Sequence, residues 1–483
     1  MDATNLLIIM DDEHNKRALG YNGHPMVKTP HLDRMAAQGT VYDYAYSSSP
    51  ICCPARAALA TGRYIHQTRY WDNALAYDGK VPSWAHVLRD RGCRVDSIGK
   101  LHYLNDEIDG GFSEQVIPMH IEGGVGDLYG LLRNPLPIRH QSSDLARSIG
   151  PGETTYTRYD RDITAKTIEW LQEAARLKSA KPWILFSSFI APHSPLIAPP
   201  EFYELYSPRD IVLPERTAAR HPWIQAWDDC YRFDSYFESD AQRKIAIASY
   251  YGLCSFVDFN VGRIMSALEE SGLAHDTRVI FLSDHGDNLG TRGLWGKSNM
   301  YEESAGIPLI ACGPDSIPGR RVTTPVSLVD LYPAILQAVG EDAAIPKRLP
   351  GRSIFDIADE PYDGQRVAFS EYHAAGSVNA CYMLRKGQYK YIHYTGFAPE
   401  LFDLEADPYE RVDLAWQPDM GGVIGDFLRE LNSICDPLAM DVAAKSDQQA
   451  LVERHGGAER ILARGGSSYT PIPGEEIKLI GRH

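Results

Sequence analysis

The amino-acid sequence predicts an α/β protein whose main part is a doubly wound, mostly parallel sheet sandwiched by helices. It also predicts a smaller C-terminal α+β subdomain built on an antiparallel sheet. Apolar strand-like runs alternate with amphipathic helical segments over about the first 340 residues. Several runs are apolar almost throughout, as in parallel strands covered on both faces. After about residue 360, short aromatic and β-branched runs separated by glycines replace this pattern.

Five runs are predicted to be strands of the main sheet: residues 5–10 (NLLIIM), 94–100 (RVDSIGK), 183–190 (WILFSSFI), 278–286 (RVIFLSDHG) and 307–313 (IPLIACG). Four segments have helical spacing of apolar residues: 29–39, 164–177, 244–272 and 327–340. Three of these four segments end at a glycine, which commonly terminates a helix. In a doubly wound sheet, ligands bind beyond the carboxyl ends of the strands.

The C-terminal part has a different pattern. Residues 366–373, 380–387 and 389–396 read as antiparallel strands, and residues 422–435 as a last helix. We therefore expect a catalytic domain over residues 1–360, a subdomain over 361–440 and a tail over 441–483. The tail has weak periodicity, and we expect either an ordered oligomerisation arm or a flexible end.

Composition excludes several classes of protein. The 483 residues carry a formal net charge of −16, which argues against nucleic acid and an anionic membrane surface as partners. The sequence start lacks the basic and long apolar regions of a signal peptide, and no apolar run approaches the roughly 20 residues of a membrane span. The eight cysteines are scattered and form no C-x-x-C pair. We expect a soluble, cytoplasmic protein in a reducing compartment.

Chemically active side chains follow the predicted strands at their carboxyl ends. They are Asp11, Asp12, Glu13, Lys100, His102, His193, Asp284 and His285. A single strand-terminal Asp is more often a turn former or a helix cap than a ligand, and a single Lys is most often a solvated charge. Two acidic clusters at two parallel strand ends, with a histidine beside the second, can together hold a divalent cation. The sequence therefore predicts one site at this edge of the sheet.

Residues 47–64 (SSSPICCPARAALATGRY) place two cysteines directly before a proline and an arginine. Pro54 suits the first turn of a helix, so Cys52 would lie at the N-terminal end, where free N–H groups and the helix dipole favour negative charge. Arg56 lies one turn further on and can reach back toward an anion. The pattern predicts that an anionic nucleophile is stabilised at position 52.

From Cys52, this stretch resembles the signature of the type I sulfatases of the alkaline-phosphatase-like superfamily, C-x-P-x-R followed by T-G. Counting from Cys53 puts the proline at the wrong offset. The resemblance implies that a formylglycine-generating enzyme oxidises Cys52 to formylglycine (3-oxoalanine), whose hydrate is the nucleophile. The alternative interpretation is a buried structural thiol before a helix.

The resemblance extends over about residues 4–435 and implies a set of metal ligands. NLLIIMDDE resembles the family's first strand and gives Asp12, with Glu13 where many members have Asp or Gln. Asp11 falls where the family is usually not acidic and receives no ligand role. SDHGDNLG resembles the second metal motif and gives Asp284 and His285. The implied cofactor is one divalent ion, Ca²⁺ or Mn²⁺ with Mg²⁺ as a third option, because members with Asn in place of this histidine are usually calcium proteins.

Four further segments resemble family motifs that handle the ester: GKLHY, APHSPL, GLWGKSNMYEES and RYWDNALAY. They give Lys100, His102, His193, Lys297 and Asn73. By this resemblance, both lysines, Arg56 and Asn73 neutralise the sulfuryl oxygens. His193 protonates the leaving alcohol, and His102 deprotonates the second hydroxyl of the sulfated diol, which expels sulfate.

The expected reaction is metal-dependent hydrolysis of a small anionic sulfate monoester, an alkyl, aryl or choline sulfate, to an alcohol and inorganic sulfate. A phosphonate monoester or phosphodiester hydrolase on the same site is the alternative, and Lys100 with His102 favours sulfate. A non-catalytic binding protein is a more remote alternative. Trp71 and Tyr103 are aromatic candidates for binding a quaternary ammonium, although core packing accounts for most such residues. A homo-oligomer, dimer or tetramer, is also expected.

Overall fold

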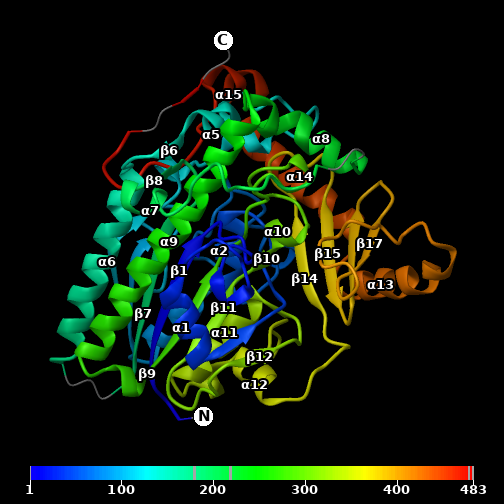
Figure 1. The fold of residues 1–483 in the computed structure, drawn as a ribbon. Coiled ribbons are helices and arrows are strands. Elements are labelled where there is room, and N and C mark those ends of the chain that lie inside the picture. The colour runs from blue at the N-terminus through cyan, green and yellow to red at the C-terminus, as the bar shows by residue number, and fades with distance from the viewer. Residues whose placement is uncertain (1, 178–180, 217–219, 477–478, 481–483) are drawn as a thin grey trace.

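The computed structural model describes residues 2–177, 181–216, 220–476 and 479–480 and has the predicted α/β architecture. An eight-stranded sheet lies between two layers of helices, and a four-stranded antiparallel sheet stands to one side (Figure 1). Both parts of the predicted fold class are confirmed. The segments around α5, α8 and α15 lie at the top of Figure 1, above the main sheet.

The main sheet has the strand order β12-β2-β11-β9-β1-β7-β4-β5. Its strands are β1 (Asn5–Asp12), β2 (Thr40–Tyr42), β4 (Arg94–Lys100), β5 (Glu114–Met119), β7 (Trp183–Pro192), β9 (Thr277–Ser283), β11 (Leu309–Cys312) and β12 (Arg320–Val322). The strands from β9 through β1, β7 and β4 to β5 run parallel. Asp11 lies opposite Ser283 and Asp12 opposite Pro192, so β1, β9 and β7 end at the same level.

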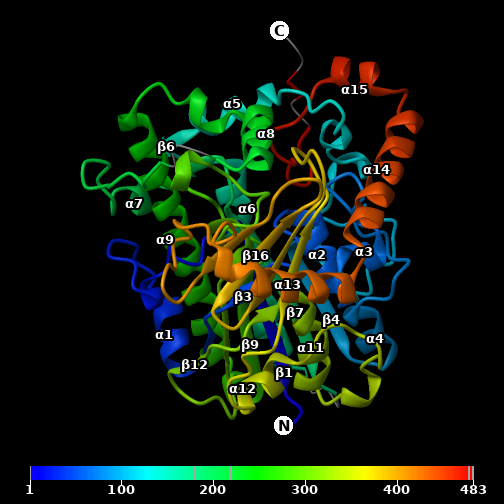
Figure 2. The same cartoon turned by 90° about the vertical axis from the view of Figure 1, so that its right-hand side faces the viewer.

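Alternation along β1 explains why helices cover both faces of the sheet. Leu7 and Ile9 pack with one set of helices, whereas Leu6 and Ile8 pack with the other, because successive strand side chains point to opposite faces. The first set is α1 (Pro30–Gln38), α6 (Thr155–Ala174) and α9 (Asp240–Glu270). The second is α2 (Cys52–Thr61), α4 (Trp84–Asp90), α11 (Leu331–Ala338) and α12 (Ile354–Asp359), visible in Figure 2.

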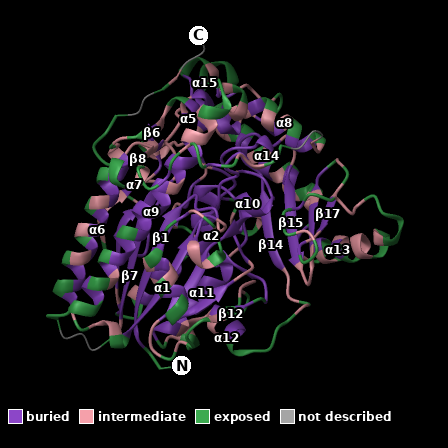
Figure 3. Cartoon of the chain, viewed as in Figure 1, coloured by how far each residue is buried: buried purple, intermediate pink, exposed green. Residues whose placement is uncertain are grey.

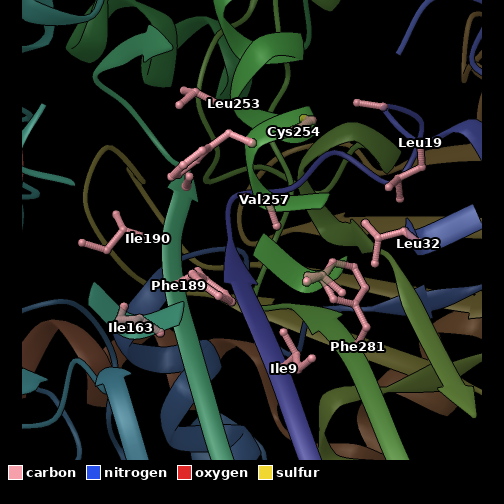
Figure 4. Close-up of a cluster of buried hydrophobic side chains, with 14 of the residues drawn as sticks. Ile9, Leu19, Leu32, Ile163, Phe189, Ile190, Leu253, Cys254, Val257 and Phe281 are labelled. Atoms are coloured by element: carbon pink, nitrogen blue, oxygen red, sulfur yellow. The ribbon is translucent and has the colours of Figure 1, made fainter. Parts of the chain in front are cut away.

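Figure 4 shows the core between the sheet and the first set of helices. Ile9, Phe189 and Phe281 of three neighbouring strands meet Leu253 and Val257 of α9 there. Figure 3 shows the strands buried and the outer faces of α6 and α13 exposed. Thr154 accepts a hydrogen bond from Thr157 N at 3.0 Å and caps α6, so this helix begins before its predicted start at residue 164.

The predicted strand over residues 307–313 departs from the parallel pattern. β11 pairs antiparallel with β9 and with β2. Gly306–Ile307 instead form β10, which joins β3 (Ala45–Tyr46) and β13 (Val326–Ser327) in a separate small sheet. Pro308 separates the two strands and has no N–H to donate to a ladder. The main sheet is therefore mostly parallel, with β11 running antiparallel between β9 and β2.

The antiparallel sheet of the C-terminal part contains β14 (Ala368–Tyr372), β15 (Cys381–Lys386), β16 (Tyr389–Tyr394) and β17 (Glu400–Asp403), paired in chain order. Phe427 and Leu431 of α13 (Gly421–Ile434) pack against Phe369, Tyr382 and Tyr391 of its strands. The division of the chain at residue 360 stays a prediction, since a shared cluster joins Tyr46 and Trp223 to this sheet.

The segment predicted as a tail packs against its own chain. It contains most of α14 (Pro437–Arg454) and all of α15 (Ala458–Arg464). Val452 and Ile461 pack against Leu128 and Leu131, and Gln448 donates to Asp72 Oδ2 at 2.7 Å. A role in oligomerisation stays a prediction.

Besides short 3-10 helices, the described chain contains further α-helices and strands. They are α3 (Ile65–Thr68), α5 (Ser143–Arg147), α7 (Pro200–Tyr203), α8 (Pro222–Tyr231), α10 (Glu302–Ala305), β6 (Ile149–Pro151) and β8 (Leu196–Ala198). All eight cysteines are buried and free of disulfides. Among the described residues, no helix combines the length and apolar character that crossing a bilayer requires.

Candidate active site

A cavity of about 180 Å³ lies at the carboxyl ends of the parallel strands. Seven residues predicted from the sequence line it: Glu13, Cys52, Asn73, Lys100, His102, His193 and Lys297. The other four predicted residues contact Cys52 or one another: Asp12, Arg56, Asp284 and His285. The structure thus brings together all eleven residues from distant parts of the chain.

Cys52 is the first residue of α2 and is 1% exposed. Its Sγ lies 3.5 Å from Asp12 Oδ1, 3.3 Å from His285 Nε2 and 3.4 Å from Lys297 Nζ. Burial and the neighbouring Asp12 raise the pKa of the thiol, against the opposing effect of Lys297. A reactive cysteine normally has a lowered pKa. This site therefore does not favour an ordinary thiolate nucleophile.

Arg56 joins the two strand ends that carry the acidic residues. Its Nε donates to Asp284 Oδ2 and its NH2 to Asp12 Oδ2, each at 2.9 Å. NH1 donates to the carbonyl of Lys100 at 2.7 Å and to Ser188 Oγ at 3.0 Å. Every guanidinium nitrogen is thus used within the protein, and Arg56 does not line the cavity. Its charge compensates two buried carboxylates that would otherwise repel one another.

The two carboxylates differ in their electrostatics. Burial tends to raise the pKa of Asp12, but Lys100 Nζ at 2.7 Å and Arg56 hold it well below its usual range. Burial and the negative Asp12 instead raise the pKa of Asp284 to about 7. A cation between them would lower the pKa of Asp284 by favouring its charged form.

Four residues form a cluster with the ligand types of a divalent metal site. Asp12, Cys52, Asp284 and His285 each offer an atom, and these atoms all lie within 4.8 Å of one another. His285 Nε2 is 3.9 Å from Asp12 Oδ1 and 3.6 Å from Asp284 Oδ1. Carboxylates suit Mg²⁺, Ca²⁺ and Mn²⁺ and an imidazole suits transition metals, so these ligand types fit a divalent ion without selecting one.

Glu13, the remaining predicted ligand, belongs to a neighbouring group with Asp12 and His193. Its Oε2 lies 2.8 Å from Lys297 Nζ and 3.3 Å from His193 Nε2. Its φ of 70° is the left-handed conformation, held by the Tyr250 hydroxyl, which donates to its carbonyl at 2.7 Å. Burial raises the pKa of Glu13 to about 7 against the opposing charge of Lys297.

His193 is oriented by the turn that ends β7. The Asp160 carboxylate accepts the N–H groups of Ile190 and Ala191, both at 2.8 Å, and so holds this strand end. His193 Nδ1 lies 2.7 Å from the carbonyl of Ser194, which can only accept, so this nitrogen carries the proton. His193 Nε2 is thereby left for Glu13 and the cavity.

His102 is 4% exposed, and neither ring nitrogen has a hydrogen-bond partner among the described residues. Its φ is 55°, and its N–H donates to the carbonyl of Met119 at 2.8 Å. Burial and the nearby charges of Lys100 and Arg56 hold its pKa well below the usual value. His102 is therefore a neutral imidazole with a nitrogen free to accept a proton.

Lys297 and Asn73 come from loops rather than strand ends. Gly296, before Lys297, has a φ of 66°, and its carbonyl accepts a hydrogen bond from Asn288 N at 2.7 Å. Burial opposes the charge of Lys297, but Cys52 and Glu13 raise its pKa well above the usual value. Asn73 Oδ1 accepts the N–H of Cys53 at 3.1 Å and so lies beside the start of α2.

Two protein families match this chain. The family described as sulfatase matches residues 4–341. The chain belongs to the sulfatase family. A second family, described as N-sulphoglucosamine sulphohydrolase, C-terminal, matches residues 290–436.

Two curated sulfatases illustrate the similarity. The choline-sulfatase of Rhizobium meliloti (strain 1021) is 30% identical over 86% of this chain and 83% of its own length. The arylsulfatase K of Bos taurus is 29% identical over 89% of this chain and 82% of its own length. The protein is accordingly a sulfuric ester hydrolase.

A solved structure supports the fold. The phosphonate monoester hydrolase of Agrobacterium radiobacter superposes with a TM-score of 0.72, over 89% of this chain and 95% of that one, at 23% identity. This likeness shows the α/β architecture common to sulfatases and that hydrolase.

Several residues around the cavity of this sulfatase are not among those predicted from the sequence. Ser188, which holds Arg56, is a polar residue inside the apolar run WILFSSFI and could have been noticed there. The other missed residues lie outside the strand ends and carry no motif. They include Asp127, Tyr129, Arg139, Gln141, Tyr156, Trp227, Tyr231, Phe233 and residues 464–470.

Trp71 and Tyr103, the aromatic candidates for binding a quaternary ammonium, lie outside the cavity lining. Trp71 is 1% exposed and donates from Nε1 to Asp447 Oδ2 at 2.7 Å. Tyr103 packs edge-to-face on Tyr77 with ring centres 4.7 Å apart. Both belong to the packed interior, and neither is part of the cavity lining.

Proposed function

We propose that this sulfatase hydrolyses sulfate monoesters with a formylglycine at position 52, made from Cys52 by a formylglycine-generating enzyme, and one divalent ion. The contact of Cys52 Sγ with Asp12, His285 and Lys297 at 3.3 to 3.5 Å carries the proposal. An unmodified thiol at this position has a raised pKa, whereas an aldehyde hydrate supplies two hydroxyl groups.

The ion would be held by Asp12, Asp284 and His285 together with residue 52. When bound, it supplies positive charge that favours ionisation of a hydroxyl on residue 52 and offsets negative charge on the ester. Arg56 donates to the carboxylates of Asp12 and Asp284 and so holds them in place. We assign Arg56 this positioning role rather than contact with the sulfuryl oxygens. Glu13 is predicted from the sequence as a further metal ligand, and this role stays a prediction, since Glu13 groups with Asp12 and His193 and pairs with Lys297.

The sulfate group of the substrate would lie between Lys100, Lys297 and Asn73, which line the cavity next to residue 52. In a buried site these groups stabilise charge that develops on the sulfuryl oxygens more strongly than water does. Burial, Lys297 and Lys100 hold the pKa of His193 well below its usual value in the free protein. A bound sulfate ester offsets both lysines, which helps His193 to hold the proton that it gives to the leaving alcohol.

The roles proposed for the two histidines have different consequences. His193→Ala should lower kcat/KM at least about 100-fold for alkyl sulfates and much less for aryl sulfates, whose phenolates leave without a proton. His102→Ala should release about one equivalent of alcohol rapidly and then stall, because turnover lacks its base. Stopped-flow measurement of the alcohol, with a leaving-group series, checks both results. Equal losses across the series for His193→Ala, or a burst in that variant alone, would contradict the assignment.

Maturation of Cys52 is open to direct measurement. After production with a formylglycine-generating enzyme, the tryptic peptide that contains residues 52 and 53 should be lighter by the difference between CH2SH and CHO. Alkylation should then label only Cys53. Both cysteines lie in one peptide, so fragment ions must assign the change, and conversion of Cys53 alone would refute the proposed position.

The substrate class is tested with a panel. Aryl, alkyl and choline sulfates are compared with matched phosphonate monoesters and phosphodiesters at fixed metal concentration. We expect sulfate esters to have the highest kcat/KM. A preference for phosphonates would favour the alternative reaction, phosphonate monoester or phosphodiester hydrolysis.

The cytoplasmic location and the dimeric or tetrameric state stay predictions, which this panel does not test.

A further inference from the structure

Arg139 lines the same cavity as Cys52, yet it lies outside the set of residues considered above. It is 7% exposed, and its guanidinium lies over two aromatic rings, 5.6 Å from the centre of Tyr129 and 5.3 Å from that of Tyr231. Its backbone N–H donates to the carbonyl of Cys230 at 2.8 Å, which ties it to α8. Arg139 is therefore a fixed, buried cation of the cavity wall.

The hydrogen bonds of this guanidinium are incomplete. NH2 donates to Asp127 Oδ2 at 2.7 Å. Within the described part of the chain, Nε and NH1 have no acceptor, although both atoms are buried. Buried polar groups are normally paired, and a buried cation with free donors is unfavourable until an acceptor reaches it. The cavity is the place from which a ligand could supply that acceptor.

Two further donors belong to the same lining. Trp227 Nε1 and Gln141 Nε2 are buried and have no partner among the described residues. The Trp227 ring lies 5.0 Å from Tyr231, one of the rings that Arg139 covers. An indole N–H and an amide NH2 can only donate. This part of the wall therefore suits a group that accepts hydrogen bonds.

The acidic residues of this part of the lining already have partners. Asp127 is paired with Arg139, and Asp144 accepts from Ser468 Oγ at 2.6 Å. Glu122 lies 3.6 Å from Arg464. Arg139 already lies over the faces of Tyr129 and Tyr231, and its like charge disfavours a cationic alcohol such as choline at these two rings.

We propose that Arg139, assisted by Trp227 and Gln141, binds a second anionic group on the alcohol part of the substrate. The preferred substrates are then sulfate esters whose leaving alcohol carries a carboxylate or a second sulfate, rather than neutral alkyl sulfates or choline sulfate. This inference rests on the proposed function, because it concerns the leaving group of the same reaction. Arg139 acts in substrate specificity and leaves the chemical steps at residue 52 unchanged.

The test compares matched substrates on the mature enzyme. The probes are 4-sulfooxybenzoate, its neutral analogue 4-sulfooxybenzamide, benzene 1,4-disulfate and choline sulfate. The amide group withdraws electrons more strongly than the carboxylate, so leaving-group ability alone favours the benzamide. We expect kcat/KM for the benzoate or the disulfate to exceed that for the benzamide about 10- to 100-fold, as for a charge-assisted hydrogen bond. Whichever anion is preferred identifies the source of the negative charge.

Arg139→Gln should reduce this preference to about one while it changes kcat/KM for the benzamide less than about threefold. Arg464→Gln is the matched control, since Arg464 lines the same cavity but is 37% exposed and already paired with Glu122. The control should keep the preference. Residue 52 is checked by mass spectrometry in each variant, so incomplete maturation cannot imitate the effect.

The wild-type protein provides a second measurement if Arg139→Gln does not fold. The product 4-hydroxybenzoate should inhibit at least about tenfold more strongly than 4-hydroxybenzamide. Equal rates and equal inhibition for the anionic and neutral compounds would overturn the inference, as would a preference for choline sulfate. If the mature wild type hydrolyses none of the sulfate esters, the proposed function itself fails.

Discussion

Cys52→Ala is expected to abolish sulfate-ester hydrolysis, with kcat/KM lower by at least about four orders of magnitude, as when a nucleophile is removed from other hydrolases. The reason is that position 52 supplies the attacking group, while Lys100 and Lys297 only neutralise charge. Because the Sγ atom is small, the backbone of α2 and its contacts should persist in the variant.

Cys53→Ala is the matched control for this change. Cys53 is adjacent, equally buried at 1% exposure, and packs against Ala76 and Ile121. Loss of its sulfur should cost about 1 kcal/mol of stability and leave most of the activity. Steady-state kinetics of both variants measures the activity, and thermal unfolding measures the stability. A Cys52→Ala enzyme with activity similar to that of Cys53→Ala would contradict the proposed nucleophile.

Asp284→Asn is expected to lose the bound divalent ion and the activity together. Asp284 offers an oxygen to the metal cluster and accepts from Arg56 Nε at 2.9 Å. Substitution of an outer partner of a metal site already costs about 10- to 100-fold in metal affinity, and loss of a direct ligand should cost more. Metal analysis after dialysis, followed by activity at increasing Mn²⁺, Ca²⁺ and Mg²⁺ concentrations, measures the effect.

Asp96→Asn separates loss of a ligand from loss of a buried carboxylate. Asp96 is also fully buried and lies on β4, where it accepts from Trp170 Nε1 at 2.8 Å and Arg94 Nε at 2.6 Å. This control should lower stability but keep stoichiometric metal. If Asp284→Asn retains metal as Asp96→Asn does, the proposed metal site is wrong.

The main limits of sequence-based prediction are visible at particular elements. The run of residues 307–313 is predicted as a strand of the mostly parallel sheet, but β11 runs antiparallel to β9. All four residues of β11 are buried, so its run is as apolar as that of a parallel strand covered on both faces. Weak periodicity over residues 441–464 hid α14 and α15, since their contacts with Leu128 and Leu131 come from a segment far away in the chain.

Strand ends in the sequence, together with the resemblance to sulfatase motifs, predicted which residues would meet at the centre of the site. The structure brings Asp12, Cys52 and Asp284 together as predicted, because parallel strands bring their carboxyl ends to one edge whatever the connections between them. The same reasoning found Lys100 and His193. These residues lie in short stretches of chain, and the side-chain types and spacing within each stretch are enough to predict a place in the site.

Only the tertiary structure decided how charge is shared and what surrounds the ester. Arg56 faces Asp12 and Asp284 and not the cavity, and Arg139 is left with free donors beside Tyr231, because burial and hydrogen bonding depend on atoms from several distant segments. The side-chain type, which the sequence gives, sets what a residue can donate or accept. Packing sets which partner it meets, and that partner determines its charge and its role.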